Sequence, residues 1–101
     1  MINVIASIRV TPEGKAKFLE IFKDNVPAVR AEAGCLEYRP TVDAETGLPP
    51  QRLDATVVTI IEKWSSLDAL RAHLDAPHMA TYREKVKTLV VGVELKVLQD
   101  A

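Results

Sequence analysis

The order of strand-like and helix-like segments is the feature that most constrains this 101-residue chain. Four stretches carry the alternating or β-branched apolar pattern of strands, namely residues 2–10, 35–42, 56–64 and 90–98. Two stretches, residues 15–31 and 66–89, repeat their apolar residues at helical spacing. The order β-α-β-β-α-β predicts an α+β, ferredoxin-like domain, in which helices cover one face of a four-stranded antiparallel sheet.

The first helical stretch carries signals at both ends and one in its interior. Thr11 is suited to cap the first turn, and Pro12 suits the first helical position. Pro27 lies inside the helical pattern, so it should kink the helix or break it before the last turn. Gly34 is expected to terminate this segment.

The second helical unit should consist of two pieces. Ser65 or Ser66 can cap the first piece, and residues 75–77, which read Asp-Ala-Pro, should end it. The next helix is expected from His78 to about Leu89. The second helical unit is thus expected to be split at Pro77.

The connection between the second and third strands should be long. Residues 43–55 hold one glycine, two prolines and several charges, and long loops in compact domains are often functional or involved in contacts. Pro40 lacks a backbone donor, so the second strand should lie at a sheet edge or bulge at this residue.

The third strand is apolar on both of its sides. Val58 and Ile60 alternate with Val57 and Ile61, whereas helices can cover only one face of such a sheet. We therefore expect a homodimer in which two sheets pack face to face. The alternative is local apolar exposure on a monomer.

The composition fits a soluble globular protein, with 48% apolar and 27% charged residues, and the length suits one domain over residues 1–101. A net charge of −1 lacks the concentrated positive field that nucleic acids and anionic membranes attract, and no apolar run approaches the length of a membrane span. The N-terminus shows no signal-peptide pattern, and the single Cys35 cannot form an internal disulfide. We expect a cytoplasmic protein.

The two histidines are the first candidates for chemistry. His73 lies beside the apolar stripe of its helix, and His78 follows Pro77 in the first turn of the next helix. The positive end of that helix favours the neutral imidazole, which can accept a proton. Each histidine could equally be a structural residue that bridges two helices. A metal site formed with Asp75 is disfavoured, because the proline break fits no known ligand spacing.

Aromatic and polar residues around the histidines complete the candidate site. Tyr82 follows His78 by four residues and shares its helical face, and Trp64 ends the third strand where it could line a pocket. Tyr38 and Arg39 point to opposite faces of the second strand, so either could reach a ligand. Each could also serve packing or solvation alone.

Two further residues are expected outside the site. Cys35 follows a glycine and has no evident base beside it in the sequence, so we expect a buried, inert thiol. Asn3 lies on the less apolar face of the first strand, which is the face assigned to the dimer.

Short motifs at matching spacing run nearly from end to end of the chain. They are Val4-Ile5-Ala6 with Pro12 and Gly14, Val26-Pro27, Glu32-Ala33-Gly34-Cys35 with Tyr38, Val42-Asp43, Glu62-Lys63-Trp64, Ala72-His73-Leu74, and Pro77-His78-Met79 with Tyr82. With these motifs the chain resembles the antibiotic biosynthesis monooxygenase superfamily, and it is similar to the small bacterial quinol monooxygenases in that group.

The resemblance implies a dimeric α+β barrel and the oxidation of quinols or related phenols by O₂ without a metal or organic cofactor. An ionised, electron-rich phenol can itself pass an electron to O₂, so the protein needs an apolar cavity, a base and a few hydrogen bonds. Under this hypothesis His78 or His73 is the base, Tyr82 is a hydrogen-bonding partner and Trp64 is a stacking wall.

Other activities of related proteins are also considered. Haem-degrading members use an Asn, a Trp and a His, and an approximate alignment places Ala6, His73 and Arg83 at those positions, so haem degradation is not expected. Some relatives isomerise small phosphorylated ketones, which would need a cation such as Arg71, Arg83 or Lys87 near His78. A small-ligand-binding dimer without turnover is the third alternative.

Overall fold

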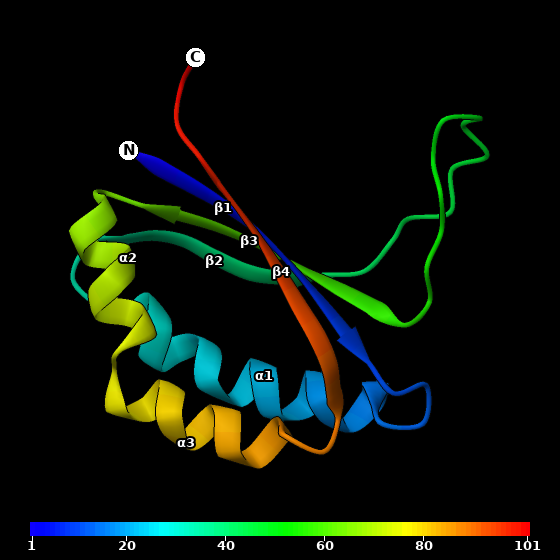
Figure 1. Ribbon diagram of the computed structural model, residues 1–101, viewed down its shortest axis with the longest axis horizontal. Helices are drawn as coiled ribbons and strands as arrows, with labels where there is room; N and C mark the ends of the chain where they lie inside the picture. Colours follow the sequence, from blue (N-terminus) through cyan, green and yellow to red (C-terminus); the bar gives the residue numbers. More distant parts are fainter.

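The four expected strands form one antiparallel sheet in the order β2-β3-β1-β4, and the helices cover one of its faces (Figure 1). The computed structural model describes all 101 residues. The elements are β1 (Ile2–Val10), α1 (Lys15–Arg30), β2 (Cys35–Thr41), β3 (Val57–Trp64), α2 (Leu67–Leu74), α3 (Pro77–Val86) and β4 (Val90–Leu98). This topology confirms the ferredoxin-like arrangement.

The boundaries of α1 differ from the expectation in two details. The Thr11 side chain accepts a hydrogen bond from the Gly14 N–H at 3.1 Å, which closes a turn, so the helix begins at Lys15 as its pattern predicted but Pro12 is not its first residue. The helix then continues through Pro27 to Arg30, so Pro27 does not break it. The Ala31 N–H donates to the Pro27 carbonyl at 3.1 Å and preserves the last turn.

Gly34 ends this segment in the left-handed region, with φ of +83°. A Cβ atom at this position would lie 2.6 Å from the Ala69 side chain, so the close approach of α2 also requires glycine. This turn directs the chain into β2, which lies at the edge of the sheet as Pro40 predicted. The β2–β3 register shifts between Cys35 and Glu37, however, and not at Pro40.

The split between α2 and α3 lies at residues 75–77, as the sequence predicted. Ser66 caps α2 by accepting a hydrogen bond from the Ala69 N–H at 3.1 Å, and α3 begins at Pro77. The last helix ends at Val86, three residues before the expected Leu89, because residues 87–89 form a turn into β4.

The two faces of the sheet have different characters. Inward-facing Val58 and Ile60 are buried under the helices, whereas Val57 and Ile61 are half-buried on the helix-free face. Ile61 is paired there with Ile5 of β1, and polar side chains surround the pair. The expectation that β3 is apolar on both sides is confirmed, and the homodimer stays a prediction.

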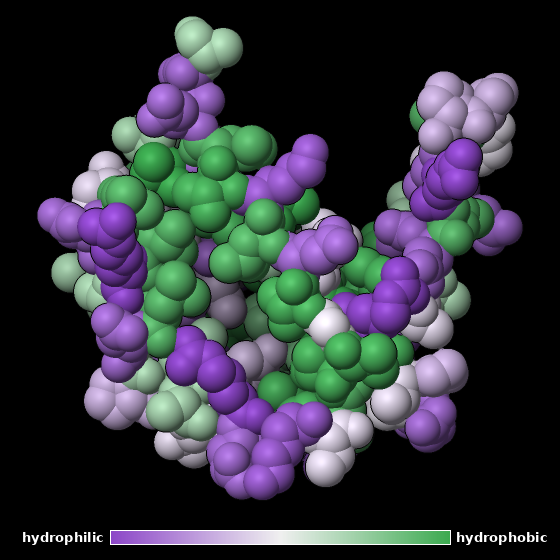
Figure 2. Space-filling view, viewed as in Figure 1, coloured by the Kyte–Doolittle hydropathy of each residue, from purple (hydrophilic) through white to green (hydrophobic).

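Helix packing is uneven across the inner face. α1 packs on β2, α2 on β3, and α3 chiefly on α1, so no helix lies tightly on β4. Val93, Leu95 and Val97 pair with inward-facing β1 residues but remain 56%, 48% and 47% exposed. We call these three residues the β4 overhang. Figure 2 shows apolar side chains gathered on this side of the molecule around a hollow.

The loop between β2 and β3 stands away from the helices (Figure 1). Asp54 anchors its base by an ion pair with Arg9 at 2.9 Å, and Gln51 donates to the Ala44 carbonyl at 2.7 Å within the loop. None of the three helices combines the length and the apolar run that crossing a membrane requires.

Candidate active site

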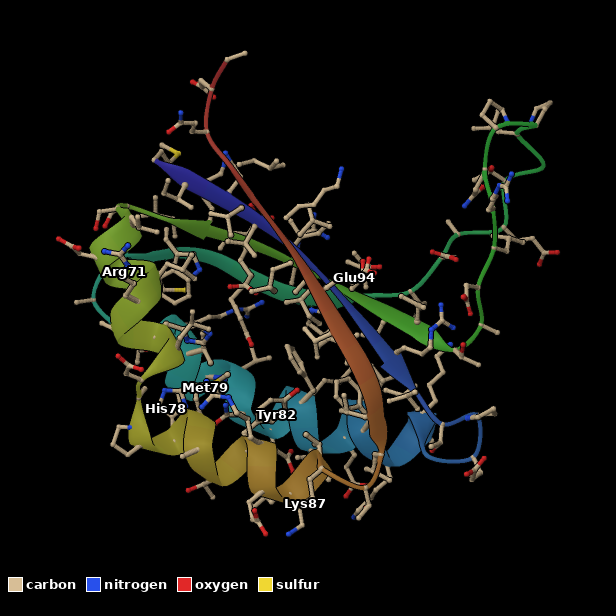
Figure 3. All side chains as sticks on the ribbon, in the orientation of Figure 1. Arg71, His78, Met79, Tyr82, Lys87 and Glu94 are labelled. Atoms are coloured by element: carbon tan, nitrogen blue, oxygen red, sulfur yellow. The ribbon has the colours of Figure 1, made fainter.

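A cavity of about 340 Å³ lies between the inner face of the sheet and helices α2 and α3. Its volume falls in the range of small-molecule sites, and 12 of its 16 lining residues are hydrophobic. Met79 and Tyr82 project into it from the side of α3 that faces the sheet (Figure 3). The other four lining residues are Glu62, His73, Arg83 and Lys87, and two of the twelve hydrophobic ones, Tyr38 and Tyr82, also carry a hydroxyl group.

His73 is held rigidly at the wall of the cavity. It comes from the last turn of α2, its side chain is only 2% exposed, and its ring packs against Trp64 with centroids 4.7 Å apart. Nδ1 lies 2.7 Å from the Glu32 carboxylate, which can only accept, so Nδ1 carries the hydrogen. Nε2 forms no hydrogen bond within the protein and is not sealed from the cavity.

The charge state of His73 follows from its surroundings. Burial lowers its pKa below the usual value, and the hydrogen bond to Glu32 opposes this shift only in part. The ring is therefore neutral at pH 7, and the contact with Glu32 is a hydrogen bond to a neutral imidazole. A neutral ring with Nε2 free toward the cavity is a proton acceptor.

Two tyrosine hydroxyls share the cavity wall with His73. The Tyr38 ring lies edge-on to the His73 ring at 5.4 Å, and Tyr82 reaches the cavity from α3. Burial raises the pKa of both phenols, so both keep their protons at neutral pH. Neither hydroxyl forms a hydrogen bond within the protein, and neither hydroxyl oxygen is fully buried. Both can donate to an oxygen atom of a ligand.

Glu62 is an acidic residue that the sequence reading did not select. It projects inward from β3, is 6% exposed, and accepts a hydrogen bond from the Trp64 indole at 2.9 Å. Burial raises the pKa of its carboxyl group. Trp64 itself is completely buried and does not line the cavity, so it supports Glu62 and His73 from behind.

His78 lies outside the main cavity, in the first turn of α3 on the helical face that it shares with Tyr82. It lines a second, polar pocket of about 180 Å³ together with Asp24, Asn25 and Lys85. Its Nε2 is 3.4 Å from the same Glu32 oxygen that bonds His73. Neither ring nitrogen of His78 forms a hydrogen bond.

The other selected residues occupy different surroundings. Arg39 is exposed on the helix-free face and pairs with Glu37 at 2.8 Å, which separates it from the cavity. Cys35 is half-buried rather than buried, because it lies in the edge strand. Burial raises the pKa of its thiol, and the nearby acidic groups add to this shift, which agrees with an inert role. Asn3 lies on the helix-free face as expected.

Glu32 and Glu62 are the functional candidates that sequence reasoning missed. Glu62 carried a signal, because strict alternation through β3 places its charge on the inner face between Ile60 and Trp64. No sequence signal pointed to Glu32, because 41 positions separate it from His73 and only the tertiary fold brings the two residues together.

The three cations that could anchor the phosphate of a substrate do not lie together as unpaired charges. Arg71 is exposed and 4.0 Å from Asp68, outside the cavity. Arg83 lies at the cavity wall but donates to the Leu74 carbonyl at 2.5 Å, and Lys87 pairs with Glu84. No observation favours phosphate at this site, and no three or more potential ligands are arranged to hold a metal ion.

An apolar chamber with a neutral histidine and two phenol donors defines a small-molecule site in a ferredoxin-like fold. The family model of the antibiotic biosynthesis monooxygenases matches residues 1–85, and the chain belongs to this family. It is 39% identical over 101 residues to "Probable quinol monooxygenase YgiN" of Escherichia coli K12, covering 98% of this chain and 97% of that protein.

Solved structures agree with this assignment. PA3566 from Pseudomonas aeruginosa is 26% identical and superposes with a TM-score of 0.81, covering 99% of this chain and 93% of that one. Rv0793 from Mycobacterium tuberculosis is also 26% identical with a TM-score of 0.81, covering 99% and 94% of the two chains. The ferredoxin-like fold of the single chain is thereby confirmed, and the dimeric barrel that the resemblance implies stays a prediction.

Proposed function

We propose that this protein is a cofactor-independent monooxygenase that oxidises a quinol or a related phenol with O₂. The observation that carries the proposal is His73, whose Nε2 is free toward an apolar cavity while Nδ1–H is held by Glu32. Membership of the monooxygenase family and similarity to a relative named as a quinol monooxygenase support the same reaction class.

The cavity residues divide the reaction between them. His73 takes the proton of a substrate hydroxyl, and the hydroxyls of Tyr38 and Tyr82 donate to the phenolate that forms. The electron-rich phenolate then passes electrons to O₂, which partitions into the apolar chamber. In the overall reaction one oxygen atom enters a ring C–H bond and the other leaves as water. The substrate supplies all four electrons as it becomes a hydroxyquinone.

Oxygen uptake tests this function directly. Purified protein is given a panel of benzene-1,4-diols and naphthalene-1,4-diols, and substrate oxidation without protein is subtracted. We expect uptake to depend on the protein, and His73→Gln to lower kcat/KM on the order of 10²- to 10⁴-fold. Lys17→Gln, which changes an exposed residue of α1 away from the cavity and from the helix-free face, should retain the original rate.

The alternatives give different outcomes in the same assay. Binding of the diols without oxygen uptake would leave a small-ligand-binding protein. Turnover of phosphorylated ketones without oxygen would favour the isomerase. Unchanged kinetics in His73→Gln would remove the assigned base.

We also propose that the protein acts as a homodimer through the helix-free face of the sheet. Ile5 and Ile61 form an apolar pair at the centre of this face, and no helix covers them. Sedimentation equilibrium should give twice the chain mass, and Ile61→Lys should shift the protein toward monomer. Thr81→Lys on the exposed surface of α3 is the matched control. A monomer in the original protein would refute this assembly.

A further inference from the structure

The two histidines, His73 near the end of α2 and His78 near the start of α3, meet at one carboxylate oxygen. Glu32 Oε2 is 2.7 Å from His73 Nδ1 and 3.4 Å from His78 Nε2. His73 lines the apolar cavity, whereas His78 lines the second, polar pocket. Glu32 follows α1 in the turn before β2, so three separate parts of the chain converge at this point.

We propose that His73, Glu32 and His78 form a proton relay between the apolar cavity and the second pocket. This inference rests on the proposed function, because it takes His73 as the group that ionises the substrate. It adds a route and two positioning residues, Glu32 and His78, neither of which needs to touch the substrate.

The relay solves a problem that the cavity creates. A phenol proton placed on His73 would leave an imidazolium against mostly apolar walls, where a charge is costly. Burial and the positive charges of Arg83 and a protonated His78 act against that charge, while Glu32 favours it. Passing the proton onward through Glu32 removes the charge from the cavity and leaves the phenolate free to react.

The proton transfers balance without any electron transfer. The substrate O–H bond breaks and its proton joins His73 Nε2, while the proton on Nδ1 passes to Glu32 Oε2. Glu32 passes a proton to His78 Nε2, and His78 gives up its Nδ1 proton to water. When the departing oxygen atom needs protons to form water, the same transfers run backward and restore both imidazole tautomers.

The surroundings of His78 allow its ring to rotate while it carries a proton. Its side chain is 28% exposed, but both ring nitrogens are covered and unpartnered, so the ring can turn toward the pocket without breaking a hydrogen bond. The charged groups that share this pocket are Asp24 from α1 and Lys85 from α3. When His78 is protonated, attraction to Glu32 should shorten the 3.4 Å contact into a hydrogen bond.

A probe that ionises without being oxidised separates the relay from the proposed function. Bound 4-nitrophenol absorbs visible light only as the phenolate, and temperature-jump relaxation measures how fast it ionises. In dilute buffer we expect Glu32→Gln and His78→Ala each to slow this ionisation at least tenfold. Adding imidazole should restore the rate in His78→Ala, because imidazole can occupy the space of the missing ring. Lys85→Gln, in the same pocket but outside the relay, should leave the rate unchanged.

Each outcome is decisive. A His78→Ala variant that keeps the original rate, or that slows and is not rescued by imidazole, overturns the relay. His78→Gln provides a second variant of similar size if the alanine protein folds poorly, and it should also be slow. If the probe ionises as described while quinols cause no oxygen uptake, the relay stands and the monooxygenase proposal fails. Failure of the original protein to ionise the bound probe overturns both.

Discussion

The inner face of the sheet is packed on one side and hollow on the other. On the packed side, Phe18 of α1 and Val58 and Trp64 of β3 have no exposed surface. On the same face of the sheet, the β4 overhang keeps about half of each side chain exposed, because α3 packs against α1 rather than on β4. The difference shows that the position of α3 over α1, away from β4, leaves room for the cavity.

The polar groups follow the same division. The hydrogen bonds Trp64–Glu62 and His73–Glu32 each join a residue of the cavity wall to a residue outside the lining, and they fix side-chain positions. The groups left without protein partners, among them the hydroxyls of Tyr38 and Tyr82, face the hollow side. The packed side therefore holds the reactive groups in place, and the hollow side accepts the ligand.

The largest expected effect is on stability in the packed half. Phe18→Ala removes a completely buried ring and should lower the free energy of unfolding by about 3–5 kcal/mol. Leu95→Ala in the β4 overhang should cost about 1 kcal/mol or less, because half of that side chain is already exposed. Urea unfolding of both variants measures the contrast. Similar losses in the two variants would mean that the β4 overhang is covered in solution.

A second prediction fills the hollow half. Ala6 lines the cavity, so Ala6→Leu should lower the affinity for 1-naphthol at least tenfold, on the order of 1.4 kcal/mol in binding free energy, while stability stays close to the original. Isothermal titration measures the affinity. Ser7→Leu adds a larger side chain on the opposite face of the same strand and should leave binding unchanged. Equal losses in both variants would show that the ligand binds elsewhere.

The smallest effect concerns the buried carboxyl group of Glu62. Its pKa is raised in the folded protein, so folding favours the protonated form and stability falls as pH rises above about 4.5, the usual value for Glu. Glu62→Gln removes this penalty and keeps an acceptor for the Trp64 indole. It should raise the free energy of unfolding by about 0.5–2 kcal/mol at pH 7 and by almost nothing below pH 4.

Thermal unfolding at the two pH values measures the effect of Glu62→Gln. Glu13→Gln, at an exposed position before α1, is the control that should change little at either pH. A loss of stability in Glu62→Gln at pH 7 would mean that the charged carboxylate is stabilised where it lies.

The sequence predicted the strands and helices well because each carried a local signal. Alternation set the faces of β3, Ser66 marked the start of α2, and Pro77 marked the start of α3. The errors arose where local signals compete. Thr11 and Gly14 closed a turn before α1, and the chain left α3 at Val86 to reach β4.

The candidate site was only partly predictable. His73, Tyr38 and Tyr82 were selected and do line one cavity, whereas Trp64 lies behind its wall and Arg39 faces the other side of the sheet. The residue type of Trp64 suggested an aromatic ring near a pocket. It did not show whether other side chains would separate that ring from the cavity. Glu32 escaped because its role depends on contacts with α2 and α3, which are distant in the sequence.

The proline corner between α2 and α3 has a consequence for how such a protein can diversify. Because α3 starts afresh at Pro77 and packs mainly on α1, its tilt is not dictated by α2 or by the strands. Met79, Tyr82, Arg83 and Val86 all reach the chamber from this one short helix. Exchanging a few side chains on a single ten-residue segment can thus change which molecules are admitted, while His73 and its supports stay where the sheet and α1 hold them.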